Sequence, residues 1–246
     1  IAWSIVGLLS LCAAARAGPV LIGGTNSGVI YDVDPTTGAA SNPRDTGLQN
    51  LLGLAWSSNG VLYGLEHVPF IGPTLVTINL HSGNPTVVGT PGFAGADVDI
   101  AFDPTTGTLF GASNQPGVGV GDLFRIDAGS GVASRVGFIP GTFGLAVDPH
   151  GEVFLLGNNV LYNIDKQTAQ VLGTVPLNPN LLGLVGATFA PDGRLFITDT
   201  LPGDVDSLYL LDKGTGMFNQ LGPTGVADGI TNLTYVPEPF TGVLVG

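Results

Sequence analysis

Apolar residues along this chain fall in short runs that alternate with turn residues, and the runs recur in a fixed order. Five segments share one arrangement, an apolar triplet and then a turn: GLAWSSNG, DIAFDPTTG, GLAVDPHG, GATFAPDG and NLTYVPEP. They begin at Gly53, Asp99, Gly144, Gly186 and Asn232, so the pattern recurs every 42 to 46 residues. No long helical period appears outside the N-terminal segment, and such short runs are typical of β-strands. The pattern therefore predicts an all-β repeat.

Each repeat contains the parts of a four-stranded sheet. The first turn leads to a second strand such as VLYGL, a third strand such as LFRID, a second turn such as DKGTG and a fourth strand such as FNQLG. Pro early in a turn presets φ, and Gly near its end permits a positive φ. Four strands in a period of this length are typical of the blades of a β-propeller.

The two ends of the repeat region predict how the ring closes. NLTYV near the C-terminus has no second strand after it, and PVLIGGTN near the N-terminus has no first strand before it. Pairing these two segments would remove the open sheet edges. We therefore expect residues 18–236 to form a five-bladed β-propeller closed by pairing of the N-terminal and C-terminal strands. A fragment of a larger propeller and an open β-solenoid are the alternatives.

Composition excludes several functions. Only 11% of residues are charged, and seven Lys plus Arg against nineteen Asp plus Glu give a net charge of −12. Binding to nucleic acid or to anionic lipid needs clustered basic residues, and here they are scattered. Cys12 is the one cysteine, so the chain can form no intrachain disulfide and the fold must be held by its core.

The first 17 residues have the composition of a secretory signal. Ala2 to Ala15 is apolar apart from two serines, and Ala15 and Ala17 are the small residues of a cleavage site before Gly18. We expect residues 1–17 to be a signal peptide whose basic n-region is missing. A buried N-terminal strand or helix is the alternative. A lipoprotein signal at Cys12 would need a small residue where Leu11 stands.

The last residues resemble the start of a PEP-CTERM sorting signal. The motif is Pro237, Glu238 and Pro239, and the apolar run FTGVLVG follows it as far as Gly246. In this family the motif precedes a transmembrane stretch and a basic cluster, an exosortase processes the signal, and the hosts are Gram-negative bacteria that make exopolysaccharide. The resemblance implies that residues 237–246 begin a truncated anchor segment and that the protein is secreted or displayed at the cell surface. The IDxxTGxxxxVG and GLAxDPxG patterns also resemble propeller repeats of such secreted proteins. A Pro-x-Pro linker after the last strand is the alternative.

The expected strand order places candidate ligand-binding residues on one face of the propeller. The turns DPTTG, DPHG and APDG lie on the other face, where Asp103, Asp148 and Asp192 are expected to support the turns, as are Asp34, Asp127, Asp165 and Asp212. The candidate face collects polar residues from second-strand ends and from the starts of first strands: Glu66, His67, Asn114, Asn158, Asp199 and Asp228. Asp97 and Asp99 are two apart on a strand and could hold calcium, which takes oxygen ligands. No other cofactor is expected.

The sequence contains no G-x-S-x-G, H-E-x-x-H or P-loop motif. We therefore expect a non-catalytic propeller of the envelope or extracellular matrix that binds polysaccharide or protein at the polar channel mouth. One alternative is a secreted hydrolase or lyase for a carbohydrate or lactone, which would use Glu66, Asp97, Asp199 and Asp228. Another alternative is a calcium-binding structural module.

Overall fold

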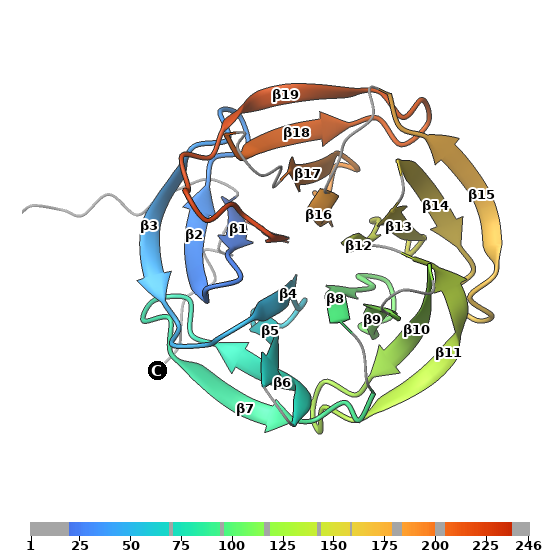
Figure 1. Ribbon diagram of the computed structural model, residues 1–246, viewed down its shortest axis with the longest axis horizontal. Coiled ribbons are helices and arrows are strands. Elements are labelled where there is room, and N and C mark those ends of the chain that lie inside the picture. Colours follow the sequence, from blue (N-terminus) through green and yellow to red (C-terminus); the bar gives the residue numbers. More distant parts are fainter. Residues whose placement is uncertain are drawn as a thin grey trace, which may run out of the picture.

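Five antiparallel four-stranded sheets surround a central axis (Figure 1). The computed structural model describes residues 20–68, 71–93, 96–115, 119–141, 144–157, 159–178, 184–199 and 205–237, with backbone alone at 96–98 and 184–185. The inner strands β4, β8, β12, β16 and β20 contact one another in a ring. The predicted five-bladed β-propeller is confirmed.

The sheets have the following strands, from the axis outward. Blade 1 consists of β4 (Leu51–Trp56), β5 (Leu62–Val68), β6 (Gly72–Ile78) and β7 (Pro85–Gly89). Blade 2 consists of β8 (Ala96–Phe102), β9 (Leu109–Asn114), β10 (Val120–Ile126) and β11 (Ala133–Pro140). Blade 3 consists of β12 (Gly144–Val147), β13 (Val153–Gly157), β14 (Val160–Ile164) and β15 (Val171–Pro176). Blade 4 consists of β16 (Leu184–Phe189), β17 (Leu195–Asp199), β18 (Ser207–Leu211) and β19 (Phe218–Pro223). Blade 5 consists of β20 (Asn232–Val236), β1 (Val20–Gly24), β2 (Val29–Val33) and β3 (Ala40–Asp45).

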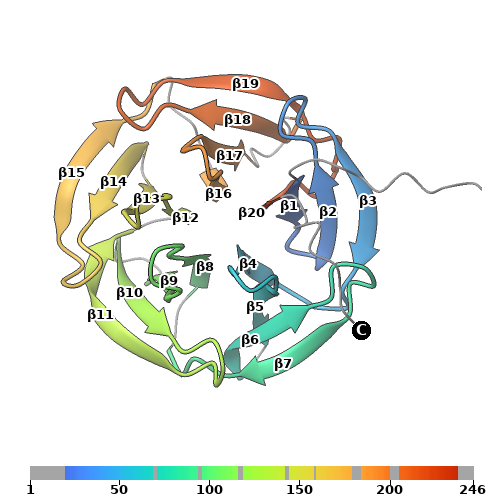
Figure 2. The same cartoon turned by 180° about the vertical axis from the view of Figure 1, so that it is seen from behind.

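Blade 5 joins the two ends of the repeat region, as predicted. β20 lies beside β1 (Figure 2) and pairs with it in antiparallel orientation, with Leu21 opposite Tyr235. Leu21 and Leu233 are buried together with Phe196 of blade 4. The closing strand therefore contributes both a hydrogen-bonded edge and part of a hydrophobic core, and it does so without a disulfide.

The hydrophobic cores lie between neighbouring blades, because strand side chains alternate between the two faces of each sheet. Phe154 of blade 3 packs with Phe189 and Ile197 of blade 4, and equivalent clusters fill the other four junctions. At the periphery, the pairing of every outermost strand contains a register shift. Such bulges weaken the ability of an exposed edge strand to pair with another chain.

The glycine of the second turn has a packing role that follows from the ring. Gly216 has a φ of 72°, and a Cβ on it would overlap the carbonyl oxygen of Pro176 in the preceding blade. Gly38, Gly83 and Gly131 make similar contacts with the blade before them. Ala169 stands at this position in blade 3 and has a φ of 63°. The repeated TG pattern is therefore explained by close contact between blades as well as by turn geometry.

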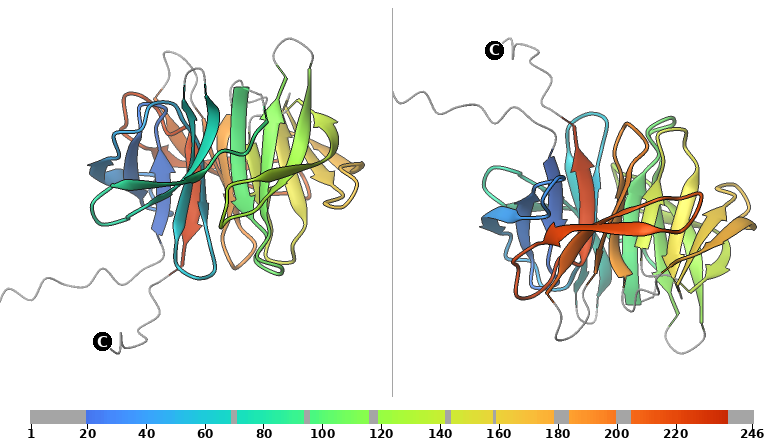
Figure 3. Two further views of the ribbon diagram at one scale, coloured as in Figure 1. Left: turned by 90° about the horizontal axis from the view of Figure 1, so that it is seen from below. Right: turned by 90° about the horizontal axis from the view of Figure 1, so that it is seen from above.

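The propeller has two different faces, which the side views separate (Figure 3). The turn face carries the turns between first and second strands and between third and fourth strands. The loop face carries the connections between second and third strands and between one blade and the next. On the turn face Asp34, Asp127, Asp165 and Asp212 accept backbone N–H groups two and three residues on, so their predicted role in turns is confirmed.

Candidate functional site

Two buried carboxylates of the turn face are each bound by a lysine from the next blade. Lys166 donates to Asp103 at 2.7 Å, and Lys213 donates to Asp148 at 2.7 Å. The two Asp side chains are 0% and 1% exposed. Asp192 forms an exposed ion pair with Arg194 of the same turn. All three acids serve the turns, as predicted, but the lysine partners were missed, because each lies more than sixty residues further along the chain.

The hydrogen bonds of these acids outweigh the effect of burial. Burial acts to raise the pKa of Asp103, but Lys166 and Thr105 bind the charged form and hold the pKa at about 2. Burial acts in the same direction on Asp148, and Lys213 together with two backbone N–H groups keeps its pKa below the usual value. At neutral pH both groups are ionised and fully engaged in structure, so neither is available to a ligand or a substrate.

An apolar cavity of about 440 Å³ opens at the turn-face end of the channel. The inner strands form its wall, with small residues such as Ala55, Ala101 and Ala187. Four aromatic residues complete it: Trp56, Phe102, Phe189 and Tyr235. A volume of this size is ordinary for a ligand site, which is usually concave and mostly apolar. The cavity lies at the end of the channel opposite the predicted ligand-binding face, and no pattern in the sequence predicts it.

Prolines at the end of the inner strands contribute to the rim of the cavity. Pro104, Pro149 and Pro191 lie two residues after the last residue of the inner strands of blades 2, 3 and 4. Pro237 occupies the same position of the repeat, where it directly follows Val236, the last residue of β20. The repeat alone therefore accounts for Pro237, the first residue of the predicted sorting motif. Glu238 and Pro239 lie outside the described residues, as do Ala15 and Ala17 of the predicted cleavage site.

Most polar groups in the cavity wall are already hydrogen-bonded. The Ser57 hydroxyl bonds the backbone of Val61, and Thr234 Oγ1 accepts the N–H of Trp56 at 3.0 Å. Asp103 is bound by Lys166. Within the described residues this leaves Ser58 and Thr188 as the hydroxyl groups of the wall that form no hydrogen bond. The wall therefore offers a ligand a large apolar surface and few polar contacts.

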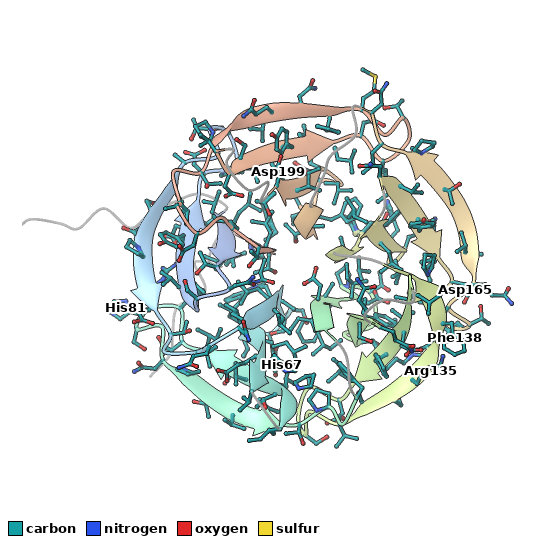
Figure 4. All side chains as sticks on the ribbon, viewed as in Figure 1. His67, His81, Arg135, Phe138, Asp165 and Asp199 are labelled. Carbon is teal, nitrogen blue, oxygen red and sulfur yellow. The ribbon has the colours of Figure 1, made fainter. Side chains whose placement is uncertain are left out.

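The residues predicted to bind a ligand at the loop face are held separately. Glu66 accepts the N–H of Gln49 at 2.8 Å, Asp228 is exposed and accepts from Ser27 at 3.0 Å, and Asp199 is buried beside the Tyr209 hydroxyl. His67 and Asp199 lie on opposite sides of the central axis (Figure 4). Asn114 ends β9, and Asn158 lies outside the described residues. The described members of this set therefore lie on one face of the propeller, but they do not converge on a common binding site.

Asp99 is buried and is held by hydrogen bonds from the backbone. It is 5% exposed, and its two oxygens accept the N–H groups of Ile100 and, across the blade junction, Leu145, each at 2.8 Å. Burial raises its pKa well above the usual value, and the two N–H groups offset part of that rise. The register of β8 shifts between Ala96 and Asp99, so strict alternation does not apply there, and the side chain of Asp97 is not described. Among the described residues no three His, Cys, Asp or Glu side chains are placed to share a metal ion.

Asp206 is a loop-face carboxylate that the sequence analysis missed. It is 6% exposed, and its Oδ2 accepts from the Thr224 hydroxyl at 2.6 Å and from the Ile230 N–H at 2.9 Å. Its Oδ1 is buried and has no hydrogen-bond partner among the described residues. Burial raises the pKa of Asp206 to about 6, with a smaller contribution from the charge of Asp199. Asp206 ties the entry of β18 to the connection before β20, a role that depends on tertiary contacts.

Comparison with known proteins shows the fold and no family. No family model and no curated protein sequence matches the chain. Among solved structures, it is similar to a gluconolactonase from Xanthomonas campestris, at 13% identity and a TM-score of 0.52 over 91% of this chain and 84% of that one. It is also similar to TolB from Acinetobacter baumannii, at 17% identity and a TM-score of 0.50 over 85% of this chain and 53% of that one. At these identities the likeness concerns the propeller architecture alone.

No helix within the described residues is long and apolar enough to span a membrane.

Proposed function

We propose that this chain is a non-catalytic binding protein that takes an uncharged, apolar segment of another protein in the turn-face cavity. The observation that carries the proposal is the cavity itself, which is apolar, about 440 Å³ in volume and lined by four aromatic residues. Aromatic side chains supply large contact areas and dominate the energetics of many binding sites.

The chemistry of the wall favours a protein over a polysaccharide. A sugar chain carries many hydroxyl groups, and burying a hydroxyl without a hydrogen bond costs about 1–3 kcal/mol. The wall hydroxyls of Ser57 and Thr234 are already engaged. An apolar peptide segment makes no such demand, and an acidic ligand would be repelled by a protein of net charge −12.

The catalytic alternative has less support. A hydrolase built on carboxylates needs at least two of them facing one bond at close range. Asp103 and Asp148 are ion-paired at the cavity end, and Asp99 accepts two backbone N–H groups. The gluconolactonase likeness concerns the fold, so it favours no particular reaction here.

The test of the cavity is dye binding. Nile red, an uncharged apolar dye, should bind with a fluorescence increase, and Thr188→Asp should weaken that binding at least tenfold, because a charge in an apolar cavity must be desolvated. Thr106→Asp, at an exposed position of the same face, is the matched control and should leave binding unchanged. Equal binding by the protein and by Thr188→Asp would contradict the assignment.

We further propose export through the N-terminal signal and sorting by an exosortase-type enzyme in a Gram-negative envelope, with transient membrane anchoring. Residues 1–17 and the Glu238-Pro239 dipeptide with the following apolar run support this. Fractionation of a Gram-negative host that expresses the protein should place it outside the cytoplasm. Replacing Glu238 and Pro239 by alanine should leave export intact and block processing; unchanged processing would contradict the sorting proposal.

A further inference from the structure

The repeat brings one equivalent position of all five inner strands to the wall of the turn-face cavity. This position is the third residue of the segments GLAW, DIAF, GLAV, GATF and NLTY, and its five occupants all line the cavity: Ala55, Ala101, Ala146, Thr188 and Thr234. Blades 1 to 3 have alanine there, and blades 4 and 5 have threonine. The inner strands of blades 4 and 5, β16 and β20, are neighbours in the ring (Figure 2). The hydroxyl groups at this position are therefore confined to one side of an otherwise apolar wall.

The two threonine hydroxyls differ in their bonding. Thr234 Oγ1 accepts the N–H of Trp56 from the next blade at 3.0 Å. The hydroxyl of Thr188 forms no hydrogen bond within the described part of the chain, although the residue is only partly exposed. Ser58, the other wall hydroxyl without a bond, is exposed and open to bulk water. Thr188 is therefore the wall residue whose hydrogen bonding a ligand in the cavity would change.

A ligand that fills the cavity displaces water from Thr188 and has to replace the lost hydrogen bond. Leaving a buried hydroxyl unpaired lowers affinity, because the group has lost its hydration and gained nothing in return. An apolar peptide segment has no polar side chain for this purpose, so the acceptor must be a backbone carbonyl. In the interior of an α-helix these carbonyls are already bonded to N–H groups four residues on, whereas in an extended segment they are free.

The size of the cavity also excludes a helical ligand. An α-helix with its side chains is about 10–12 Å across and rises about 5.4 Å per turn, so one turn occupies about 400–600 Å³. The cavity of about 440 Å³ holds no more than one such turn. A single helical turn is not stable in water, because nucleation fixes several residues for one hydrogen bond.

We propose that the cavity selects an extended apolar segment of its partner protein, with one backbone carbonyl of that segment accepting the hydroxyl of Thr188. This inference rests on the proposed function and adds to it the conformation of the ligand and its polar contact. The alanine side of the wall and the aromatic residues contribute apolar contact. Thr188 determines specificity, because it favours a ligand with a free acceptor over one without.

Two dyes test the hydrogen bond. Nile red has a carbonyl acceptor, and pyrene is a hydrocarbon with no hydrogen-bonding group. Thr188→Val keeps the shape of the side chain and removes the hydroxyl, and it should weaken Nile red binding about threefold to tenfold. Pyrene binding should not weaken. The emission of bound Nile red should move to shorter wavelength in this variant, because its carbonyl has lost a donor. Thr188→Ser, which keeps a hydroxyl, should bind and emit like the wild type.

A peptide pair tests the conformation of the ligand. N-acetyl-Leu-Val-Leu-amide is too short to form a helix. It should displace Nile red from the wild type and from Thr188→Ser, and it should do so several-fold less well from Thr188→Val. A hydrocarbon-stapled helix of leucine and valine should displace the dye much less well than the tripeptide.

The outcomes separate this inference from the proposed function. If both dyes bind the wild type and Thr188→Val leaves Nile red affinity and emission unchanged, or weakens both dyes equally, the hydrogen bond is not formed and the inference is wrong. It is also wrong if the tripeptide does not displace Nile red, or if the stapled helix displaces it equally well. Absence of binding of either dye to the wild type would instead contradict the proposed function.

Discussion

At the turn face, Asp103 and Asp148 are buried and each accepts a lysine ammonium from the next blade. At the loop face, Asp99 and Asp206 are 5% and 6% exposed, and the donors that bind them are neutral hydroxyl and N–H groups. The pKa is lowered at the first pair and raised at the second. The comparison teaches that low solvent exposure alone does not set the direction of a carboxylate's pKa shift, which also depends on how deeply the group is surrounded by protein and on whether an opposite charge compensates the lost hydration.

The largest predicted effect concerns the contact between blades on the turn face. Gly216→Ala places a methyl group against the backbone of Pro176, at a φ of 72°. We expect a loss of about 3 kcal/mol or more in unfolding free energy, from the left-handed backbone and from overpacking together. Gly107→Ala is the matched control, because its φ is 71° and nothing lies within 4 Å of its Cβ, and it should lose about 1 kcal/mol. Urea titration measures both, and equal losses would show that the contact is not tight.

The next effect tests the ion pair at the turn face. Asp103→Asn removes the charge that binds Lys166 and should lower the unfolding free energy by about 2 kcal/mol, since Asp103 is fully buried while Lys166 can turn toward solvent. Asp192→Asn breaks an exposed pair with Arg194 and should change stability by less than about 0.5 kcal/mol. If Asp103→Asn loses no more unfolding free energy than Asp192→Asn, the ion pair with Lys166 does not stabilise the contact between blades 2 and 3.

The pH dependence of stability sharpens the comparison, because the pKa shifts of Asp103 and Asp206 have opposite signs. The pKa of Asp206 is about 6 when folded, so its stabilising contribution is complete below the unfolded value near 3.8 and is lost as pH rises through 6. The contribution of Asp103 is present above its unfolded value and is lost as pH falls through about 2. Between pH 4.5 and 7, the stability of the wild type relative to Asp206→Asn should fall by about 2 kcal/mol. A constant difference would contradict the raised pKa.

The smallest effect is expected at the exposed acids of the loop face. Asp228→Asn leaves an exposed side chain that can still bond Ser27, so the unfolding free energy should change by less than about 0.5 kcal/mol. Thermal melting of the variant and the wild type measures this change. A loss above about 1 kcal/mol would mean that exposed carboxylates of the loop face contribute to the unfolding free energy as the buried acids of the turn face do.

Periodicity in the sequence was enough to predict the blades, their number and the closure by β1 and β20, because each depends on local strand and turn signals repeated at a regular spacing. Turn acids such as Asp34 and Asp212 were also predictable, since their hydrogen bonds run to residues two or three further on. The ligand-binding and calcium roles given to residues such as Glu66, Asp97 and Asp99 stay predictions. They depend on which side chains converge across blades, and spacing along one chain does not show that.

The sequence by itself determined an acidic, disulfide-free, all-β ring with five repeats, because composition and period are properties of the chain. Only the tertiary structure decided that Lys166 meets Asp103, that Gly216 must accommodate Pro176, and that Asp206 is buried with one oxygen that no described residue binds. It also decided that the apolar cavity opens at the turn face, with Pro237 on its wall. The physical reason is that these contacts cross from one blade to the next, where residues far apart in sequence are brought together by closure of the ring.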